Sequence, residues 1–225
     1  MEQLTFASQD IVNLALYRVE NIELLVRYAH DPSGNACRIV AELTTSESYA
    51  LLMAGVRHAK RLLQSGESEI RPHVNLSVGD MAQFLREWTE DLAGITVEVC
   101  EGTVTQQQLR EVINRVHELH GLVALDDLLS GDWHSPNLLD HPWDVIKIDR
   151  CLWQRTEVER AAIVRSLDGW MLCVEGIESR RQVEESLGLG VRWGQGYWFD
   201  TPRVGRIAPI FDVSDNALVR QVRRV

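Results

Sequence analysis

One strand-length apolar run that ends in two carboxylates constrains the fold of this chain most strongly. Residues 121–127 read Gly-Leu-Val-Ala-Leu-Asp-Asp, and residues 144–149 read Asp-Val-Ile-Lys-Ile-Asp. Apolar runs of this length are typical of strands that are buried on both faces, as in parallel sheets. The two runs would deliver Asp126, Asp127 and Lys147 to the ends or interior of such a sheet. Adjacent aspartates also occur at ordinary strand ends, so the rest of the chain must support any chemical interpretation.

Similar apolar runs alternate with helical patterns along the chain. Residues 9–19 and 21–28 are two short runs whose close spacing favours an antiparallel pair. Further strands are expected to begin at about residues 73, 95, 122, 144, 171 and 191. Helices are expected between them, over residues 46–64, 77–92, 105–120 and 157–167 and from residue 179. Capping patterns support two of these helices, because Thr105 precedes Gln108 and Ser179 precedes Gln182 by three residues.

This order of elements predicts an α/β fold, a TIM-like (β/α)8 barrel with one antiparallel strand. An open doubly wound sheet is the alternative, but the Gly-x-Gly-x-x-Gly phosphate signal after its first strand is missing. No Gly/Ser-rich linker or low-complexity stretch divides the chain. A single domain over residues 1–225 is therefore expected.

Composition and charge argue against several classes of function. The net charge of -10 does not favour contact with DNA or RNA, which requires many Lys and Arg side chains. No apolar run approaches the roughly 18 residues of a membrane span, and no signal peptide is apparent. We therefore expect a cytoplasmic protein without a membrane partner. The cysteines are too widely spaced for a zinc knuckle or a disulfide framework; they are Cys37, Cys100, Cys151 and Cys173.

Each expected strand carries a polar residue beside apolar neighbours. Because side chains alternate between the two faces of a strand, these polar residues would all point into a barrel and converge there. The set comprises Glu23, Asn75, Glu98, Asp126, Lys147, Glu175 and Gln195. Taken singly, Lys147 is more often a snorkelling side chain, Asn75 a turn former and Glu178 a helix-start charge. His117 and His120 resemble a metal pair only in isolation, and we expect them to be solvated.

Buried carboxylates at this density require cations. Each unpaired buried carboxylate costs several kcal/mol, so cations must lie among the carboxylates for the fold to be stable. Carboxylates with one amide, and without His or Cys, favour Mg²⁺, Mn²⁺ or Ca²⁺ over zinc or copper. Asp126 and Asp127 are adjacent, which allows one carboxylate to bridge two ions about 3.5–4 Å apart. The sequence therefore predicts a two-metal phosphodiester-cleaving site.

The same motifs resemble the EAL-type cyclic-di-GMP phosphodiesterases from about residue 9 to residue 202. Residues 23–28, Glu-Leu-Leu-Val-Arg-Tyr, are similar to the Glu-Ala-Leu-Leu-Arg-Trp signature, with Leu24 where alanine is usual. Further similar strings are Gln-Asp-Ile-Val from residue 9, Asn-Leu-Ser from 75, Glu-Val-Cys-Glu from 98, Val-Ile-Lys-Ile-Asp-Arg from 145, Glu-Gly-Ile-Glu from 175 and Gly-Gln-Gly-Tyr from 194. Each string is weak alone, but their order and spacing are specific.

The resemblance implies a function and a set of site residues. It implies that Glu23, Asn75, Glu98 and Asp126 hold one ion, and that Asp126, Asp127 and Glu175 hold the second. The ions would be Mg²⁺ or Mn²⁺, with Ca²⁺ inhibitory. A water activated by the ions would attack one phosphodiester of cyclic di-GMP in line and give the linear dinucleotide pGpG, lowering the level of a second messenger of biofilm and motility signalling. The remaining implied roles are catalysis by Lys147, Glu175 and Gln195, substrate binding by Arg27, Leu24 and Glu178, and loop support by Glu101.

Two departures from the family pattern leave a second hypothesis open. Residues 128–135 read Leu-Leu-Ser-Gly-Asp-Trp-His-Ser, where the family usually has Phe-Gly-x-Gly-Tyr-Ser-Ser-Leu. The stretch between Lys147 and Glu175 is also shorter than usual by roughly two helical turns. The alternative is a catalytically weak or inactive module that binds cyclic di-GMP or a regulatory protein partner. Whether the chain forms a homodimer is open for the same reason.

Overall fold

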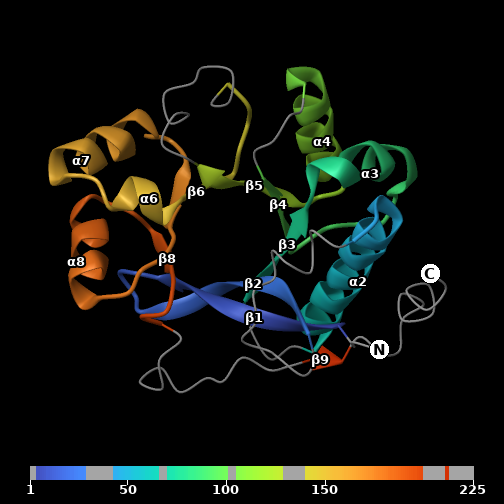
Figure 1. Cartoon of the computed structure of the whole chain (residues 1–225). Coiled ribbons are helices and arrows are strands. Elements are labelled where there is room, and N and C mark those ends of the chain that lie inside the picture. Colours follow the sequence, from blue (N-terminus) through green and yellow to red (C-terminus); the bar gives the residue numbers. More distant parts are fainter. Residues whose placement is uncertain are drawn as a thin grey trace.

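Eight strands form a closed barrel with helices around it (Figure 1). The structure is a computed structural model, which describes residues 4–28, 43–65, 70–100, 105–128, 140–199 and 211–212. Strand β1 (Leu4–Asn13) closes the barrel, since it pairs antiparallel with β2 (Arg18–Tyr28) and with β8 (Trp193–Gln195). All other neighbouring barrel strands are parallel. The predicted barrel with one reversed strand is confirmed, and the open doubly wound sheet is excluded.

The five strands between β2 and β8 follow the predicted apolar runs closely. They are β3 (Arg71–Leu76), β4 (Thr96–Cys100), β5 (Leu122–Leu128), β6 (Val145–Ile148) and β7 (Met171–Val174). A short additional strand, β9 (Phe211–Asp212), pairs with the start of β1.

The prediction of a strand over residues 9–19 is wrong at both ends. Strand β1 begins at Leu4 and stops at Asn13, where the chain turns into β2. The turn is stabilised by the side-chain oxygen of Asn13, which accepts hydrogen bonds from the backbone nitrogens of Ala15 and Leu16 at 3.1 and 3.0 Å. Tyr17 then adopts a positive φ of 50°. Asn side chains favour such local turns over strand continuation.

Helices cover the outside of the barrel in the order α2 (Thr45–Gln64), α3 (Met81–Glu87), α4 (Gln106–Glu118), α6 (Arg150–Trp153), α7 (Glu157–Ser166) and α8 (Arg180–Gly188). Thr44, Thr105 and Thr156 each form a complete capping box, which satisfies the first free N–H groups of α2, α4 and α7. Ser179 caps α8 as predicted.

The helix predicted over residues 77–92 is much shorter in the structure. A 3-10 turn, Val78–Asp80, leads into α3, and the helix ends at Glu87 because Trp88 takes an extended conformation. The indole nitrogen of Trp88 donates to the carbonyl of Glu90 at 3.0 Å, and its ring packs against Phe84. This anchored ring redirects the chain toward β4.

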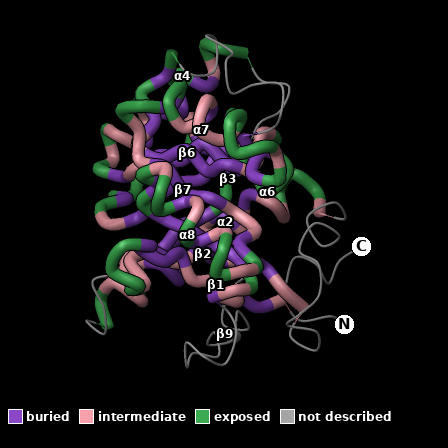
Figure 2. Tube along the Cα trace, turned by 90° about the vertical axis from the view of Figure 1, so that its left-hand side faces the viewer, coloured by how far each residue is buried: buried purple, intermediate pink, exposed green. Residues whose placement is uncertain are grey.

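Two apolar layers stabilise the barrel. The larger one lies between strands and helices, where Figure 2 shows the buried residues concentrated along the strands. The smaller one comprises Ile11, Ala124, Val145, Cys173 and Trp193. All except Ile11 lie two residues before one of the converging polar residues Asp126, Lys147, Glu175 and Gln195. By strand alternation this smaller layer fills the barrel interior beneath those polar residues. Among the described helices, none combines the length and apolarity needed to cross a membrane.

Candidate active site

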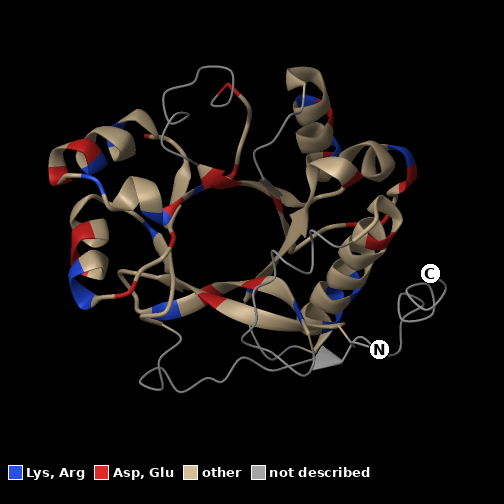
Figure 3. Cartoon of the chain, in the orientation of Figure 1, with Lys and Arg blue, Asp and Glu red and all other residues tan. Residues whose placement is uncertain are grey.

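Lys147 lies at the centre of the barrel interior and is only 1% exposed. Its Nζ atom lies 2.7 Å from Asp126 Oδ1, 2.9 Å from Glu175 Oε1, 3.0 Å from Glu98 Oε2 and 3.3 Å from Glu23 Oε2. These carboxylates come from β2, β4, β5 and the end of β7, and Figure 3 shows acidic positions recurring on the strands around the ring. The structure thus brings these predicted residues together, and the interpretation of Lys147 as a snorkelling side chain is wrong.

Charge in this cluster is strongly unbalanced. Burial would lower the pKa of Lys147, but Asp126, Glu175, Glu23 and Glu98 together raise it well above its ordinary value. Burial raises the pKa of Glu175 to about 8 despite Lys147. Burial and the neighbouring Glu23 likewise raise the pKa of Glu98 well above its usual range. Without further cations, Glu175 is therefore mostly protonated at neutral pH, and the pKa of Glu98 is shifted in the same direction.

Two amide side chains hold Glu23 from opposite sides. Asn75 Nδ2 donates to Glu23 Oε1 at 3.0 Å, and Gln195 Nε2 donates to Glu23 Oε2 at 2.6 Å. Burial would raise the pKa of Glu23, but Lys147 and these hydrogen bonds outweigh it and hold that pKa at about 2. Asn75 is thus a partner of the carboxylate cluster and not a turn former.

Gln9 belongs to the site, although its role was not predicted from the sequence. Gln195 Nε2, which donates to Glu23, also donates a hydrogen bond to the side-chain oxygen of Gln9 at 2.9 Å. Gln9 lies directly opposite Glu23 in the antiparallel register of β1 and β2. Gln9 is identified as a neighbour of the cluster only by this pairing register, which the hydrophobic pattern of the sequence does not determine.

Asp127 reaches the site through an irregularity in β5. Regular strand alternation would turn Asp127 away from Asp126, but the register against β6 shifts between Leu125 and Leu128. Asp127 has a positive φ of 54°, a left-handed conformation that Asp tolerates better than most residues. Although Asp127 is exposed, desolvation by the surrounding groups and the adjacent Asp126 raise its pKa to about 6.

Three carboxylates at this point are suited to a divalent cation. One oxygen from each of Asp126, Asp127 and Glu175 lies within 4.8 Å of the others. Carboxylate oxygens are the ligands of Mg²⁺, Mn²⁺ and Ca²⁺, and the excess of acidic over basic side chains favours such an ion. The donor set therefore fits the metals predicted from the sequence.

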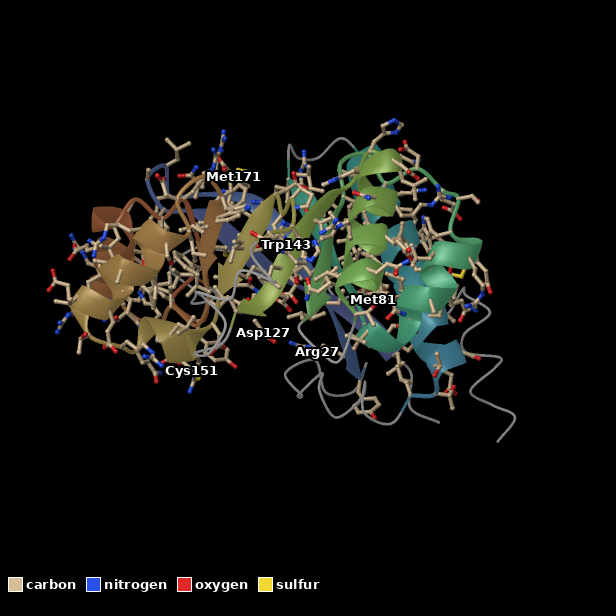
Figure 4. The ribbon with its side chains drawn as sticks, turned by 90° about the horizontal axis from the view of Figure 1, so that it is seen from above. Arg27, Met81, Asp127, Trp143, Cys151 and Met171 are labelled. Atoms are coloured by element: carbon tan, nitrogen blue, oxygen red, sulfur yellow. The ribbon has the colours of Figure 1, made fainter. Side chains whose placement is uncertain are left out.

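A cavity of about 690 Å³ opens at the cluster. Leu24 and Glu178 lie on its wall, and their role in substrate binding stays a prediction. Glu178 is 3.7 Å from the guanidinium of Arg150. Arg27 lies at the same end of the barrel as Asp127 (Figure 4), but its Nη1 donates to the carbonyl of Val26 at 2.8 Å. Arg27 is not one of the described residues that line the cavity.

The backbone near Gly196 fixes two residues of the site relative to each other. Ile177 N donates to Gln195 O at 3.0 Å, and Trp198 N donates to Ile177 O at 2.9 Å. Gly196 has a φ of 147° and lies so close to Ile177 that a Cβ would overlap the backbone of that residue. This close crossing places Glu175 beside Gln195.

Two histidines that were expected to be solvated form hydrogen-bonded pairs with aspartates. The expectation that His117 is solvated is wrong, since its Nε2 lies 2.8 Å from Asp144 Oδ2 in a partly buried pair. His120 is exposed but also pairs, with Asp91 at 3.0 Å. Glu101 and residues 129–135 of the divergent loop lie outside the described residues, so their predicted roles stay predictions.

His73 was also missed as a neighbour of the site. It is 1% exposed, and its Nδ1 lies 2.7 Å from Glu98 Oε1. Burial and the positive charge of Lys147 lower the pKa of His73 to about 3, so its ring is neutral. Strand alternation could have indicated this position, because residue 73 precedes Asn75 by two residues and lies on the same face of the strand.

Comparisons with known proteins agree with this architecture. The family model described as "EAL domain" matches residues 2–202. Cyclic di-GMP phosphodiesterase PdeL of Escherichia coli (strain K12) is 29% identical over 106 residues, which are 44% of this chain and 29% of PdeL. Probable cyclic di-GMP phosphodiesterase PdeN of the same organism is 23% identical over 227 residues, covering 89% of this chain and 44% of PdeN. The chain spans less than half the length of either relative.

Solved structures show the same fold at low sequence identity. A standalone versatile EAL protein from Vibrio cholerae O395, in its c-di-GMP-bound form, has a TM-score of 0.72 at 20% identity, covering 89% of this chain and 92% of that one. The manganese and cyclic-di-GMP complex of Klebsiella pneumoniae BlrP1 has a TM-score of 0.70 at 22% identity, covering 87% of this chain and 55% of BlrP1. A calcium complex of BlrP1 is similarly related, with a TM-score of 0.71.

Proposed function

The chain belongs to the EAL domain family, and on that premise we propose that it is a metal-dependent phosphodiesterase that opens cyclic di-GMP to the linear dinucleotide pGpG. One observation carries the proposal: four carboxylates lie within 3.3 Å of a single buried Lys147 Nζ. A single lysine does not offset the charge of all four carboxyl groups in their ionised form, and a structural core would gain more from apolar residues. Divalent ions are the natural complement to such a cluster.

The ligands divide into two groups that share one residue. We assign Glu23, Asn75, Glu98 and Asp126 to one ion, and Asp126, Asp127 and Glu175 to the other. Mg²⁺ or Mn²⁺ suits these oxygen donors, and the manganese complex of the related BlrP1 supports the choice. When bound, a pair of such ions supplies an activated water and offsets the charge on the phosphate.

The protein's own residues would position the reaction. Lys147 fixes the carboxylates in place and offsets negative charge that develops on the phosphate oxygens. Glu175, at the cavity wall, is placed to accept the proton of the attacking water. Gln195 uses its Nε2 for Glu23 and Gln9, while its Oε1 is buried without a hydrogen-bond partner among the described residues. That oxygen is free to accept a hydrogen bond from the water.

Substrate would occupy the cavity above the cluster. Its volume of about 690 Å³ is typical of sites for small molecules and too confined for a nucleic-acid duplex. Leu24 and Glu178 would contact the nucleotide from the wall, and Arg27 would bind a phosphate after its side chain leaves the Val26 carbonyl. Glu101 would support the loop after Asp127.

Hydrolysis of cyclic di-GMP by the full chain tests the proposal. With Mg²⁺ or Mn²⁺, chromatography should show conversion to pGpG, and Glu23→Ala should abolish it because that change removes a ligand and a partner of Lys147. Ca²⁺ in place of Mn²⁺ should suppress turnover. No product with either Mg²⁺ or Mn²⁺ would defeat the proposal.

A second candidate is a module that binds cyclic di-GMP or a regulatory protein without hydrolysis. The rewritten sequence of residues 128–135 favours it, since this loop follows the paired aspartates directly. Calorimetry that detects tight nucleotide binding in Mn²⁺ without any product would support this alternative. Homodimerisation remains a prediction that sedimentation analysis tests.

A further inference from the structure

His73 lies directly beneath the carboxylate cluster and is absent from the roles assigned above. It occupies β3 two residues before Asn75, so both side chains point into the barrel. In the sheet it lies beside Glu23 of β2 and Thr96 of β4. With 1% of its surface exposed, its ring is packed inside the barrel and does not touch solvent.

The ring holds one oxygen of a proposed metal ligand. His73 Nδ1 lies 2.7 Å from Glu98 Oε1, while Lys147 Nζ lies 3.0 Å from Glu98 Oε2. Glu98 is 0% exposed, so no water competes for either oxygen. A carboxylate held at both oxygens by two different strands cannot rotate freely about its terminal bond.

Metal binding by Glu98 would select one form of the neutral His73 ring. A metal-ligating Glu98 is a carboxylate, which only accepts hydrogen bonds, so His73 must donate from Nδ1. The other nitrogen, Nε2, then carries the lone pair. Nε2 is buried without a hydrogen-bond partner among the described residues, and a bare acceptor is tolerated there more readily than an orphaned N–H.

We propose that His73 is a positioning residue that donates from Nδ1 to Glu98 and so fixes this carboxylate for the ion assigned to Glu23, Asn75, Glu98 and Asp126. The inference rests on the proposed function, because it takes Glu98 as a metal ligand. Carboxylate ligands that are themselves hydrogen-bonded lose affinity for metal when the outer partner is removed. The second ion, held by Asp126, Asp127 and Glu175, does not depend on this contact.

Metal binding to three variants tests the role of His73 without any activity measurement. His73→Leu removes the donor at similar volume, and Mn²⁺ titration followed by electron paramagnetic resonance should show one of two sites weakened by about 10- to 100-fold. His73→Asn keeps an N–H near the position of Nδ1 and should recover most of that affinity. Thr96→Val is the matched control, because Thr96 is an equally buried neighbour whose hydroxyl has no hydrogen-bond partner among the described residues. It should bind both ions as the wild type does.

The outcomes separate this inference from the proposed function. Wild-type protein that binds no Mn²⁺ would overturn both. Two wild-type sites that persist unchanged in His73→Leu, or an equal loss in Thr96→Val, would overturn only the role of His73. If His73→Leu does not fold, long-range nitrogen-proton NMR of the Mg²⁺-loaded wild type determines which ring nitrogen of His73 carries the proton. The His73 signal is assigned by its absence from the spectrum of His73→Asn. An Nδ1–H ring supports the inference, whereas an Nε2–H or doubly protonated ring contradicts it.

Discussion

Lys147 Nζ and Asp126 Oδ1 lie 2.7 Å apart inside the barrel, on the neighbouring parallel strands β6 and β5. Three further carboxylates approach the same nitrogen, so this ion pair is part of a network that joins five strands or strand ends. We therefore expect the stability of the barrel interior and the affinity of the proposed site for metal to depend on the same side chain.

Lys147→Met should destabilise the metal-free protein by about 3–5 kcal/mol, the usual cost of leaving buried charges without their partner. Mn²⁺ should restore part of that loss, because the ions replace the missing positive charge. Urea unfolding in EDTA and in Mn²⁺ measures both effects.

Lys60→Met provides the matched control for this change. Lys60 pairs with Glu90 at 2.9 Å on the surface, and losing such a pair costs about 1 kcal/mol or less. Equal losses in the two variants, or no effect of Mn²⁺ on Lys147→Met, would contradict the assigned role of Lys147.

Gly196→Ala should lower turnover by about 10²-fold, the scale expected when catalytic groups shift by an ångström. The new Cβ would overlap the backbone of Ile177, which must move and carry Glu175 away from Gln195. Initial rates with cyclic di-GMP measure the effect.

Gly190→Ala separates steric overlap from backbone strain. Gly190 also has a positive φ, of 84°, but a Cβ there has nothing within 4 Å. It should cost about 1–2 kcal/mol of stability and leave turnover unchanged. Comparable rates for the two variants would show that the crossing at Gly196 does not position the site.

Glu20→Gln should reduce stability at neutral pH but much less at pH 3. Burial would raise the pKa of Glu20, but hydrogen bonds from Trp193, Asn13, Arg18 and Arg192 outweigh it and hold the pKa at about 2. A folded-state pKa below the unfolded value stabilises the protein above about pH 4.5, and this contribution is lost as the pH falls toward 2.

Urea unfolding of the wild type and Glu20→Gln at pH 7 and pH 3 checks the sign. We expect a difference of about 1–2 kcal/mol at pH 7 that shrinks at pH 3. If the difference in free energy of unfolding grows on acidification, these contacts do not stabilise the ionised form of Glu20.

Strand alternation accounts for what the sequence could predict about the site. Lys147, Glu98 and Glu23 each lie between apolar neighbours, and one hydrophobic pattern therefore indicated both the barrel and the convergence of these side chains. The reversed β1 followed from the short distance between the first two apolar runs. These features depend on local patterns, which a sequence contains.

Other features depend on register and tertiary packing. The turn of Asp127 into the site requires the shift between β5 and β6, and Gln9 is a partner only because it faces Glu23 across the hairpin. His73 has the correct parity, but β3 carries two polar residues on that face, His73 and Asn75, and the hydrophobic pattern does not show which of them contacts the cluster. The early end of α3 depends on the packing of Trp88, which helix periodicity does not report.

The central claim is that the carboxylates around Lys147 hold two divalent ions that share Asp126. Electron paramagnetic resonance of the full chain titrated with Mn²⁺ tests it most directly. We predict two Mn²⁺ per chain with a spin-coupled spectrum, because a shared carboxylate holds such ions about 3.5–4 Å apart. Binding of a single Mn²⁺, or of two with independent six-line spectra, would contradict the claim.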